Sequence, residues 1–259
     1  MNAPPRRPDG PMTFGFLPSP PPLPRIAARA LACCALVQRA EIEPPAGEPL
    51  DDDARAGIDD LIELSLDWLE RQEMAGELRP AERAALEAKA GELPADSREH
   101  YADAGEGAAV IAWALRRAPL PGFDVDADAA AVAAALGWLD EAGATLATTA
   151  HLRNREELAT YLDAVSAVHW RLRARIEPDS PATGAVSMTR WQVERFAWPE
   201  DVTPLALAED GDLALAGQSI CAAPPAALLA ALRRIRERHR ATLWLLGQAR
   251  DWDAIDLNL

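Results

Sequence analysis

The chain has 259 residues, and its 49% hydrophobic content is enough to bury a full core in one large domain or two small ones. Its 41 acidic and 26 basic residues give a net charge of −15, which argues against binding to a nucleic-acid backbone and favours basic partners. The apolar run at residues 26–37 contains Arg29 and is too short to span a bilayer, so we expect no membrane partner.

The three cysteines, Cys33, Cys34 and Cys221, form an odd set without the spacing of a metal site. Adjacent Cys33 and Cys34 in an apolar helix are poor disulfide partners for each other. The N-terminal region also lacks the basic segment and small-residue cleavage site of a signal peptide. These features predict a cytoplasmic location, where thiols stay reduced.

Residues 1–24 contain nine prolines and are expected to form a polyproline-type or disordered arm. The arm either presents a docking motif for a partner or packs Phe14 and Phe16 against its own domain. Residues 25–259 are expected to form a single helical domain.

Apolar residues at helical spacing predict helices along most of this domain. The predicted helices cover residues 25–43, 51–75, 80–90, 97–115, 126–143 and 151–177, and a short aromatic segment follows at 191–198. Gly105 and Gly107 fall inside the fourth helix, where they indicate either a break or a tight contact with another helix.

Over residues 205–215 apolar side chains recur at every second position, in two short runs with Asp210-Gly211 between them. An Asp-Gly pair in this position is a strong signal for a β-hairpin. Because a two-stranded hairpin is marginal alone, it must pack on helices. We therefore expect a mainly α fold, a multi-helix orthogonal or bundle-like domain with one small β-hairpin near residues 205–215.

A final helix is predicted between Pro224-Pro225 and Gly247, which suit a helix start and stop. The residues that close the chain carry a recognisable pattern of Glu, Arg, His, Trp and Asp. The pattern consists of Glu237, Arg238, His239, Ala241, Trp244, Leu245, Gly247, Trp252 and Asp253. It resembles the closing signature of a bacterial family known as domain of unknown function 4272.

Three further stretches, residues 39–43, 112–115 and 152–170, are similar to the same family. The resemblance covers most of the chain after residue 25. It implies a mostly helical bacterial protein, and the family brings no established activity with it.

His169 and His239 are the most specific candidates for a functional site, since each lies on an apolar helix face near a tryptophan. If their helices pack together, they could form a polar pocket inside the bundle, a usual place for a ligand. The alternative is a pair of hydrogen-bonded core histidines that fix the helix register.

Two other arrangements suggest ligands. His239 with Asp251, Asp253 and Asp256 offers suitable metal ligands, but their spacing matches no established metal motif. The arginines of residues 233–240 either bind a phosphate or an acidic partner, or neutralise nearby carboxylates.

The sequence contains no nucleophile elbow, phosphate loop or dinucleotide fingerprint, and we expect no catalytic residue, metal or cofactor. The preferred hypothesis is a non-enzymatic cytoplasmic helical protein that binds a protein partner, a basic one such as the toxin of an antidote or immunity pair. The alternative is an enzyme or small-ligand sensor with a polar pocket around His169 and His239. The candidate pocket or interface residues are His239, Arg238, Glu237, Trp244, Trp252, Asp253, His169 and Trp170.

Overall fold

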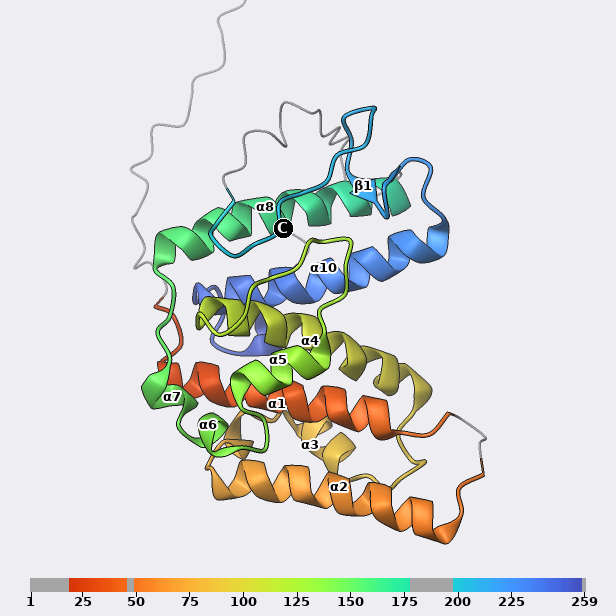
Figure 1. Ribbon diagram of the computed structural model, residues 1–259, viewed down its shortest axis with the longest axis vertical. Helices are drawn as coiled ribbons and strands as arrows, with labels where there is room; N and C mark the ends of the chain where they lie inside the picture. The colour runs from red at the N-terminus through yellow and green to blue at the C-terminus, as the bar shows by residue number, and fades with distance from the viewer. Residues whose placement is uncertain (1–18, 46–48, 178–197, 258–259) are drawn as a thin grey trace, which may run out of the picture.

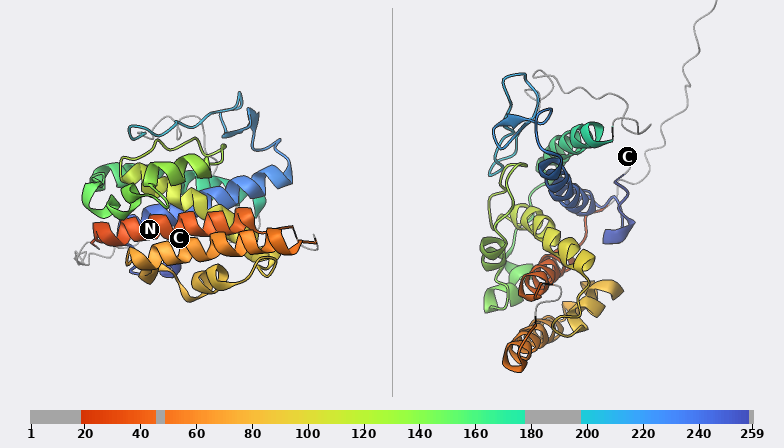
Figure 2. Two further views of the ribbon diagram at one scale, coloured as in Figure 1. Left: turned by 60° about the horizontal axis from the view of Figure 1, so that its bottom comes forward. Right: turned by 90° about the vertical axis from the view of Figure 1, so that its right-hand side faces the viewer.

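The computed structural model describes residues 19–45, 49–177 and 198–257, and it arranges them as a stack of long helices (Figure 1). The long helices are α1 (Leu23–Ile42), α2 (Asp52–Arg71), α4 (Ala95–Ala114), α8 (Arg155–Ile176) and α10 (Pro225–Leu245). From top to bottom of Figure 1 they lie side by side in the order α8, α10, α4, α1, α2, and Figure 2 shows the same succession end-on. The predicted mainly α fold is confirmed.

Helix α1 lies between α4 and α2 in the stack, and its central part is buried on all sides. Every residue from 26 to 37 is buried, and most are alanine, cysteine or another small side chain. Small side chains let α4 approach closely, and an apolar surface all round is typical of a central helix. The tryptophans then supply bulk between small-faced helices, as Trp113 and Trp244 do with fully buried rings.

Arg29 of α1 is a charged residue that is buried in this core and has a buried partner. Its Nη1 and Nη2 donate hydrogen bonds of 2.8 and 2.7 Å to the Glu82 carboxylate. Burial alone would raise the pKa of Glu82, but the hydrogen bonds and charge of Arg29 lower it to about 2. This ion pair links α1 to α3 (Pro80–Glu87), the short helix that contains Glu82.

The second and third predicted helices end earlier than their apolar patterns do. Helix α2 stops at Arg71, because Glu73 adopts a left-handed backbone with φ of 59°. A short 3-10 helix, η1 (Ala75–Glu77), follows it. Helix α3 ends at Glu87, where Ala88 takes an extended conformation.

Helix α4 runs without a break through Gly105 and Gly107, so the tight-contact alternative is the one that the structure supports. A Cβ atom on Gly107 would lie 3.2 Å from the Trp252 ring, and one on Gly105 would lie 3.4 Å from Val37. The two glycines therefore make room for neighbouring side chains inside a continuous helix.

The predicted single helix over residues 126–143 is wrong. The chain instead forms α5 (Ala129–Leu136), α6 (Glu141–Ala144) and α7 (Leu146–Thr149). The cause is Gly137, whose left-handed φ of 74° ends α5 and turns the chain sharply. Alanine-rich periodicity predicted helix correctly but could not show this turn.

The small hairpin is present, with strands β1 (Ala214–Leu215) and β2 (Gln218–Ser219) pairing antiparallel. Ala216 and Gly217 both have positive φ and form its tight turn. The predicted Asp210-Gly211 turn is closed by one isolated bridge between Leu207 and Leu213. The hairpin thus overlaps the predicted position, and its named strands lie a few residues later.

The ends of the last two long helices follow from local residues. Helix α8 begins at Arg155 because Asn154 and Glu157 form a reciprocal capping box. Helix α10 ends before Gly247, which has φ of 79°, as predicted, and η3 (Trp252–Ala254) follows. Most of the arm (residues 1–18) and the aromatic segment 191–197 lie outside the described residues.

None of the helices in the described ranges combines the length and the apolar character that a bilayer crossing requires.

Candidate functional site

Helix α10 brings together most of the residues singled out in the sequence and points them at different neighbours. Successive residues of a helix are rotated by about 100°, so Glu237, Arg238 and His239 cannot face one partner. In the structure α10 lies between α8 and α4, and η3 packs near its end (Figure 1). The candidate residues therefore form several contacts and no single site.

Arg238 is almost fully buried and joins α10 to α4 and to the loop after it. Its Nε donates a hydrogen bond of 2.7 Å to Glu106. Its remaining donors bind the backbone oxygens of Pro121, Gly122 and Val125 at 2.8 to 3.0 Å. The charge of this buried guanidinium is paired, and its N–H groups are hydrogen-bonded to the protein. The Arg238 side chain therefore has a structural role and is not available to a ligand.

Glu237 faces a cavity of about 340 Å³ between α4 and α10. Its carboxylate pairs with Arg240 of the same helix, while Arg233 approaches Asp103 at 3.4 Å across the cavity. Burial raises the pKa of Asp103 to about 6, although the charge of Arg233 acts in the opposite direction. Charges of both signs face each other here, as in a ladder of ion pairs between two helices.

Trp244 and Trp252 form a packed corner between α10 and η3. Their ring centroids lie 5.4 Å apart in an edge-to-face arrangement, and both rings are buried. The guanidinium of Arg29 lies 4.6 Å from the centroid of the Trp252 ring, a cation–π contact. Asp253 is exposed and pairs with Arg79, whereas His239 is bonded to Ser166 and His169, so the metal arrangement weighed for His239 and Asp253 is not formed by these side chains.

His169 and His239 do meet, and this contact joins α8 to α10. Their Nδ1 atoms lie 2.9 Å apart in a buried hydrogen bond, and the ring planes cross at 80°. Ser166, one turn before His169, lies with its Oγ 3.0 Å from His239 Nε2. The three side chains thus form a hydrogen-bonded chain from Ser166 through His239 to His169.

Both imidazoles are held neutral by their surroundings. Burial lowers the pKa of His239 to about 4. Burial also lowers the pKa of His169 to about 3, helped by His239 and by the positive charges of Arg173 and Arg236. Trp170 is half-buried beside this pair, with its ring 6.4 Å from the His169 ring and 5.3 Å from the Arg173 guanidinium.

A hydroxyl next to a base that is oriented by a third group is the arrangement of an activated nucleophile. An efficient general base, however, has a pKa near the working pH. With a pKa of about 4, His239 is a weak base for Ser166 at neutral pH. The low pKa of His239 therefore favours a structural chain of hydrogen bonds over a catalytic triad.

Sequence reasoning missed Ser166 and Glu106, the partners of His239 and Arg238. Ser166 precedes His169 by three residues and so lies on the same helix face, a signal that was available. Glu106 lies between two glycines that were noted for packing, and nothing in its spacing indicates that it pairs with Arg238.

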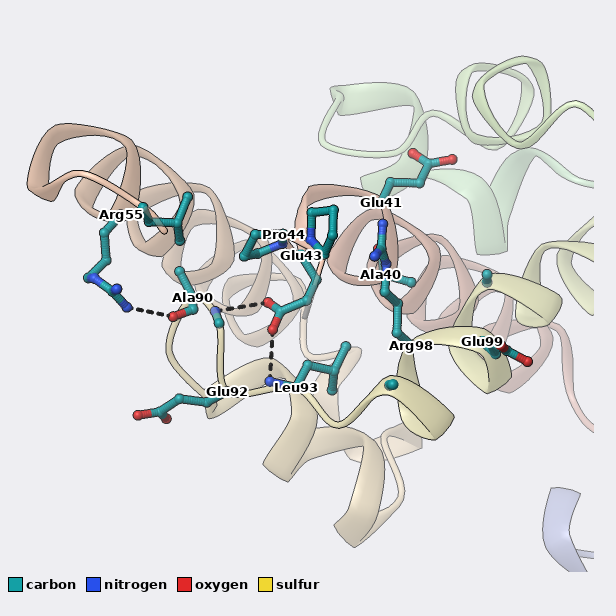
Figure 3. Close-up of a pocket in the computed structure, with 15 residues that line it drawn as sticks. Ala40, Glu41, Glu43, Pro44, Arg55, Ala90, Glu92, Leu93, Arg98 and Glu99 are labelled. Carbon is teal, nitrogen blue, oxygen red and sulfur yellow. Dashed lines mark hydrogen bonds between the residues drawn. The ribbon is translucent and has the colours of Figure 1, made fainter. Parts of the chain in front are cut away.

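A cavity of about 570 Å³ lies between the end of α1, the start of α2 and the start of α4 (Figure 3). In its wall, Arg55 donates to the Ala90 oxygen at 2.8 Å, and the buried Glu43 accepts from Leu93 N at 2.9 Å. Arg98 donates to the Ala40 oxygen at 3.1 Å. Glutamates also line the cavity, so its wall carries both signs of charge and selects no class of ligand.

The outer face of α2 is a surface that the sequence analysis did not single out. Leu61 and Leu64 are 40% and 46% exposed, although leucine is usually buried in a monomer. They lie three residues apart on one stripe of the helix, with exposed Asp60, Glu63 and Asp67 beside them. Helix α2 forms one end of the helix stack (Figure 1), so its outer face is uncovered by the other long helices.

No cluster of three or more His, Cys, Asp or Glu side chains in the described part of the chain has the geometry to hold a metal ion.

Comparison with known families identifies one match, Domain of unknown function (DUF4272), over residues 19–195. This match covers more than half of the chain, so the protein belongs to that family. The matched range includes α1 to α8 and stops before α10, which carries the closing pattern used in the sequence analysis. No curated protein and no solved structure shows significant similarity to the chain.

Proposed function

We propose that this member of the DUF4272 family is a non-enzymatic cytoplasmic protein that binds a basic protein partner through the outer face of α2. The observation that carries the proposal is the exposed pair Leu61 and Leu64 beside three exposed carboxylates. An apolar centre with a charged rim is the usual composition of a protein interface.

The charge of this face selects a basic partner. Asp60, Glu63 and Asp67 form no ion pair with any residue in the described ranges, whereas Glu70 on the same helix pairs with Arg83 at 2.9 Å. The unpaired carboxylates add to the overall charge of −15 and attract cationic surfaces over a distance. The matching partner presents lysines or arginines around apolar side chains, for example on one amphipathic helix.

The apolar stripe of α2 extends by one turn towards the start of the helix. Gly57 precedes Leu61 by one turn, and a Cβ atom placed on it would meet nothing within 4 Å. The stripe of Gly57, Leu61 and Leu64 therefore offers an open apolar track along α2 with acidic residues on one side. The cysteines support a reducing compartment, since Cys33, Cys34 and Cys221 are all unpaired thiols.

The test is affinity capture from native lysate with the full chain at low and high salt, followed by mass spectrometry. We expect one basic protein at stoichiometric level that high salt releases, because salt screens surface charges. The double variant Leu61→Ala/Leu64→Ala should lose it, whereas Leu229→Ala, which alters a leucine that is 48% exposed on α10, should retain it.

A charge series separates specific from general attraction. Asp60→Asn/Glu63→Gln/Asp67→Asn should weaken capture of the same protein. The matched control Glu141→Gln/Glu156→Gln/Glu209→Gln removes the same charge from exposed acids elsewhere and should not. Equal capture by both triple variants, or capture that depends on neither leucine, contradicts the proposed surface.

The alternative of a small-ligand site near His169 and His239 is favoured by one observation, an unpaired buried nitrogen on His169.

A further inference from the structure

Acidic residues on the outer face of α2 recur at a fixed interval. Asp53, Asp60 and Asp67 are seven residues apart, and all three are exposed. Seven residues are close to two helical turns, so these aspartates form one row along the helix, about 10 Å from one to the next. The exposed Leu61 and Leu64 lie beside this row. The surface of the proposed function therefore has a repeat along the helix axis.

Contacts inside the chain do not explain the row of aspartates. Asp53 lies in the first turn of α2, where the helix dipole favours an acid, but Asp60 and Asp67 lie beyond that turn. Glu63 follows Asp60 by three residues and precedes Asp67 by four, so these like charges are neighbours on the helix surface and repel one another. None of the four carboxylates pairs with a cation of the described ranges. Such a face suits cations that another molecule supplies.

Gly57 is a second feature of α2 that the chain itself does not require. It is exposed in the interior of the helix, where glycine is less favourable than alanine because its backbone is freer in the unfolded chain. A Cβ atom on Gly57 would meet nothing within 4 Å, so packing inside the described protein does not call for a glycine. A glycine does allow another backbone or a bulky side chain to approach the helix closely.

The length of the row indicates the secondary structure of the partner. Asp53 and Asp67 are separated by about 21 Å along the axis of α2. An extended strand of that length would need partners for its backbone N–H and C=O groups. Helix α2 has no sheet edge to offer, and the hairpin of β1 and β2 lies at the opposite end of the stack (Figure 1). A helix satisfies its own backbone and repeats its side chains at the same seven-residue interval.

We propose that the basic partner of α2 is a single α-helix of about four turns that lies lengthwise along the stripe of Gly57, Leu61 and Leu64. Its lysines or arginines recur every seven residues and face the row of aspartates. A large apolar side chain of this helix packs over Gly57, and smaller ones face the two leucines. This inference rests on the proposed function and adds the shape, the length and the charge spacing of the partner.

The experiment titrates the full chain into a fluorescent synthetic peptide of about 18 residues, long enough for the row of aspartates. Lysines stand at every seventh position of the peptide beside an apolar helical stripe. We expect saturable binding by fluorescence anisotropy, together with a gain of peptide helix by circular dichroism. A control peptide has the same amino acids in alternating apolar and polar order, and it should bind at least about tenfold more weakly because it has no helical stripe.

Two glycines provide a matched pair of variants. Gly57→Ala should raise the melting temperature of the free chain, since alanine is the better helix former. It should also weaken the peptide about tenfold, because the new methyl group occupies the close contact. A Cβ atom on Gly76 also meets nothing within 4 Å, so Gly76→Ala is the control and should leave the affinity unchanged. Higher stability with weaker binding distinguishes a contact residue from a structural one.

A charge exchange tests the register. Asp60→Lys/Asp67→Lys should lose the lysine peptide and gain a peptide that carries glutamate at the same positions. Glu156→Lys/Glu209→Lys changes the net charge equally at exposed acids elsewhere, so it should keep the lysine peptide and gain nothing.

The helical partner is overturned if the alternating peptide binds as tightly as the helical one. It is also overturned if Gly57→Ala and Gly76→Ala behave alike, or if the charge exchange fails. Capture from lysate that depends on Leu61 and Leu64, without any peptide binding, overturns the helical partner and leaves the proposed function standing. Capture that depends on neither leucine overturns the proposed function itself.

Discussion

The Nδ1 atoms of His169 and His239 lie 2.9 Å apart, within a buried contact between α8 and α10. One of the two nitrogens donates and the other accepts, so both rings must be neutral or share a single added proton. Protonation of both would place two like charges in the core. The contact therefore makes the packing of α8 on α10 sensitive to pH.

The first prediction is that the free energy of unfolding falls as the pH is lowered from 7 towards 4. The folded-state pKa values of His169 and His239, about 3 and about 4, lie below the usual 6.5. Between the folded and the unfolded pKa values, the unfolded chain binds more protons than the folded one, so lowering the pH favours unfolding. The free energy of unfolding then changes by up to about 1.4 kcal/mol per pH unit for each histidine. Urea unfolding at a series of pH values measures this slope.

Variants assign the slope to the histidine pair. His239→Gln should make stability less dependent on pH in this range, whereas the control His151→Gln, at an exposed histidine, should not. The pKa of Asp103, raised to about 6, has the opposite effect on the pH dependence of stability. As the pH is lowered, the folded state binds a proton at Asp103 at a higher pH than the unfolded chain does. The comparison between variants removes that contribution, and an unchanged slope in His239→Gln would refute the assignment.

The second prediction concerns the carboxylate that holds Arg238. Glu106 accepts from Arg238 Nε at 2.7 Å and from Ala127 N at 2.9 Å. Glu106→Ala leaves the Arg238 guanidinium buried without its charge partner and should cost about 3–5 kcal/mol of stability. Chemical unfolding measures this loss.

A double-mutant cycle identifies the cause of that loss. Arg238→Met should also destabilise alone, but combined with Glu106→Ala it should cost less than the sum of the two single changes, because the unpaired charge is gone. Strict additivity would show that the two side chains do not act as a pair.

The third prediction is that Trp244→Ala destabilises the fold by about 3–5 kcal/mol, as truncation of a buried aromatic ring does. Trp244 has no exposed surface and packs edge to face on Trp252. Trp198→Ala, at a half-buried tryptophan, should cost clearly less in the same unfolding experiment. Similar losses would mean that the corner of Trp244 and Trp252 is not a principal part of the core.

The helical fold could be predicted from the sequence because the signals for a helix lie in the residues of the helix itself and next to its ends. Apolar spacing, prolines and capping residues gave the long helices to within a few residues, and Gly247 marked the end of α10 correctly. The prediction of helix ends failed where the backbone conformation of a single residue ends a helix. Gly137 is such a residue, and it divides the helix that was predicted over residues 126–143. Its positive φ depends on contacts with α6 that the local pattern does not contain.

The candidate site was predicted less well than the fold, because a site depends on which helix faces pack together. The meeting of His169 with His239 was weighed as one alternative, and the structure supports it. Arg238, Trp244 and Asp253 were grouped with them by proximity in sequence, yet each contacts a different element. Ion pairs between distant positions, such as Arg238 with Glu106, leave no periodic signal in one sequence.

The fourth prediction separates crowding from backbone strain at two glycines with positive φ. Gly137 and Gly217 have φ of 74° and 78°, so alanine is strained at both by about 1–2 kcal/mol. A Cβ atom at Gly137 would lie 2.4 Å from the backbone nitrogen of Gly143, whereas one at Gly217 would meet nothing within 4 Å. Gly137→Ala should therefore lower the unfolding free energy by more than Gly217→Ala, with the difference caused by the clash between α5 and α6. Equal losses in thermal or urea unfolding would show that the α5–α6 turn opens readily, and that the close approach of Gly137 to Gly143 contributes nothing to stability.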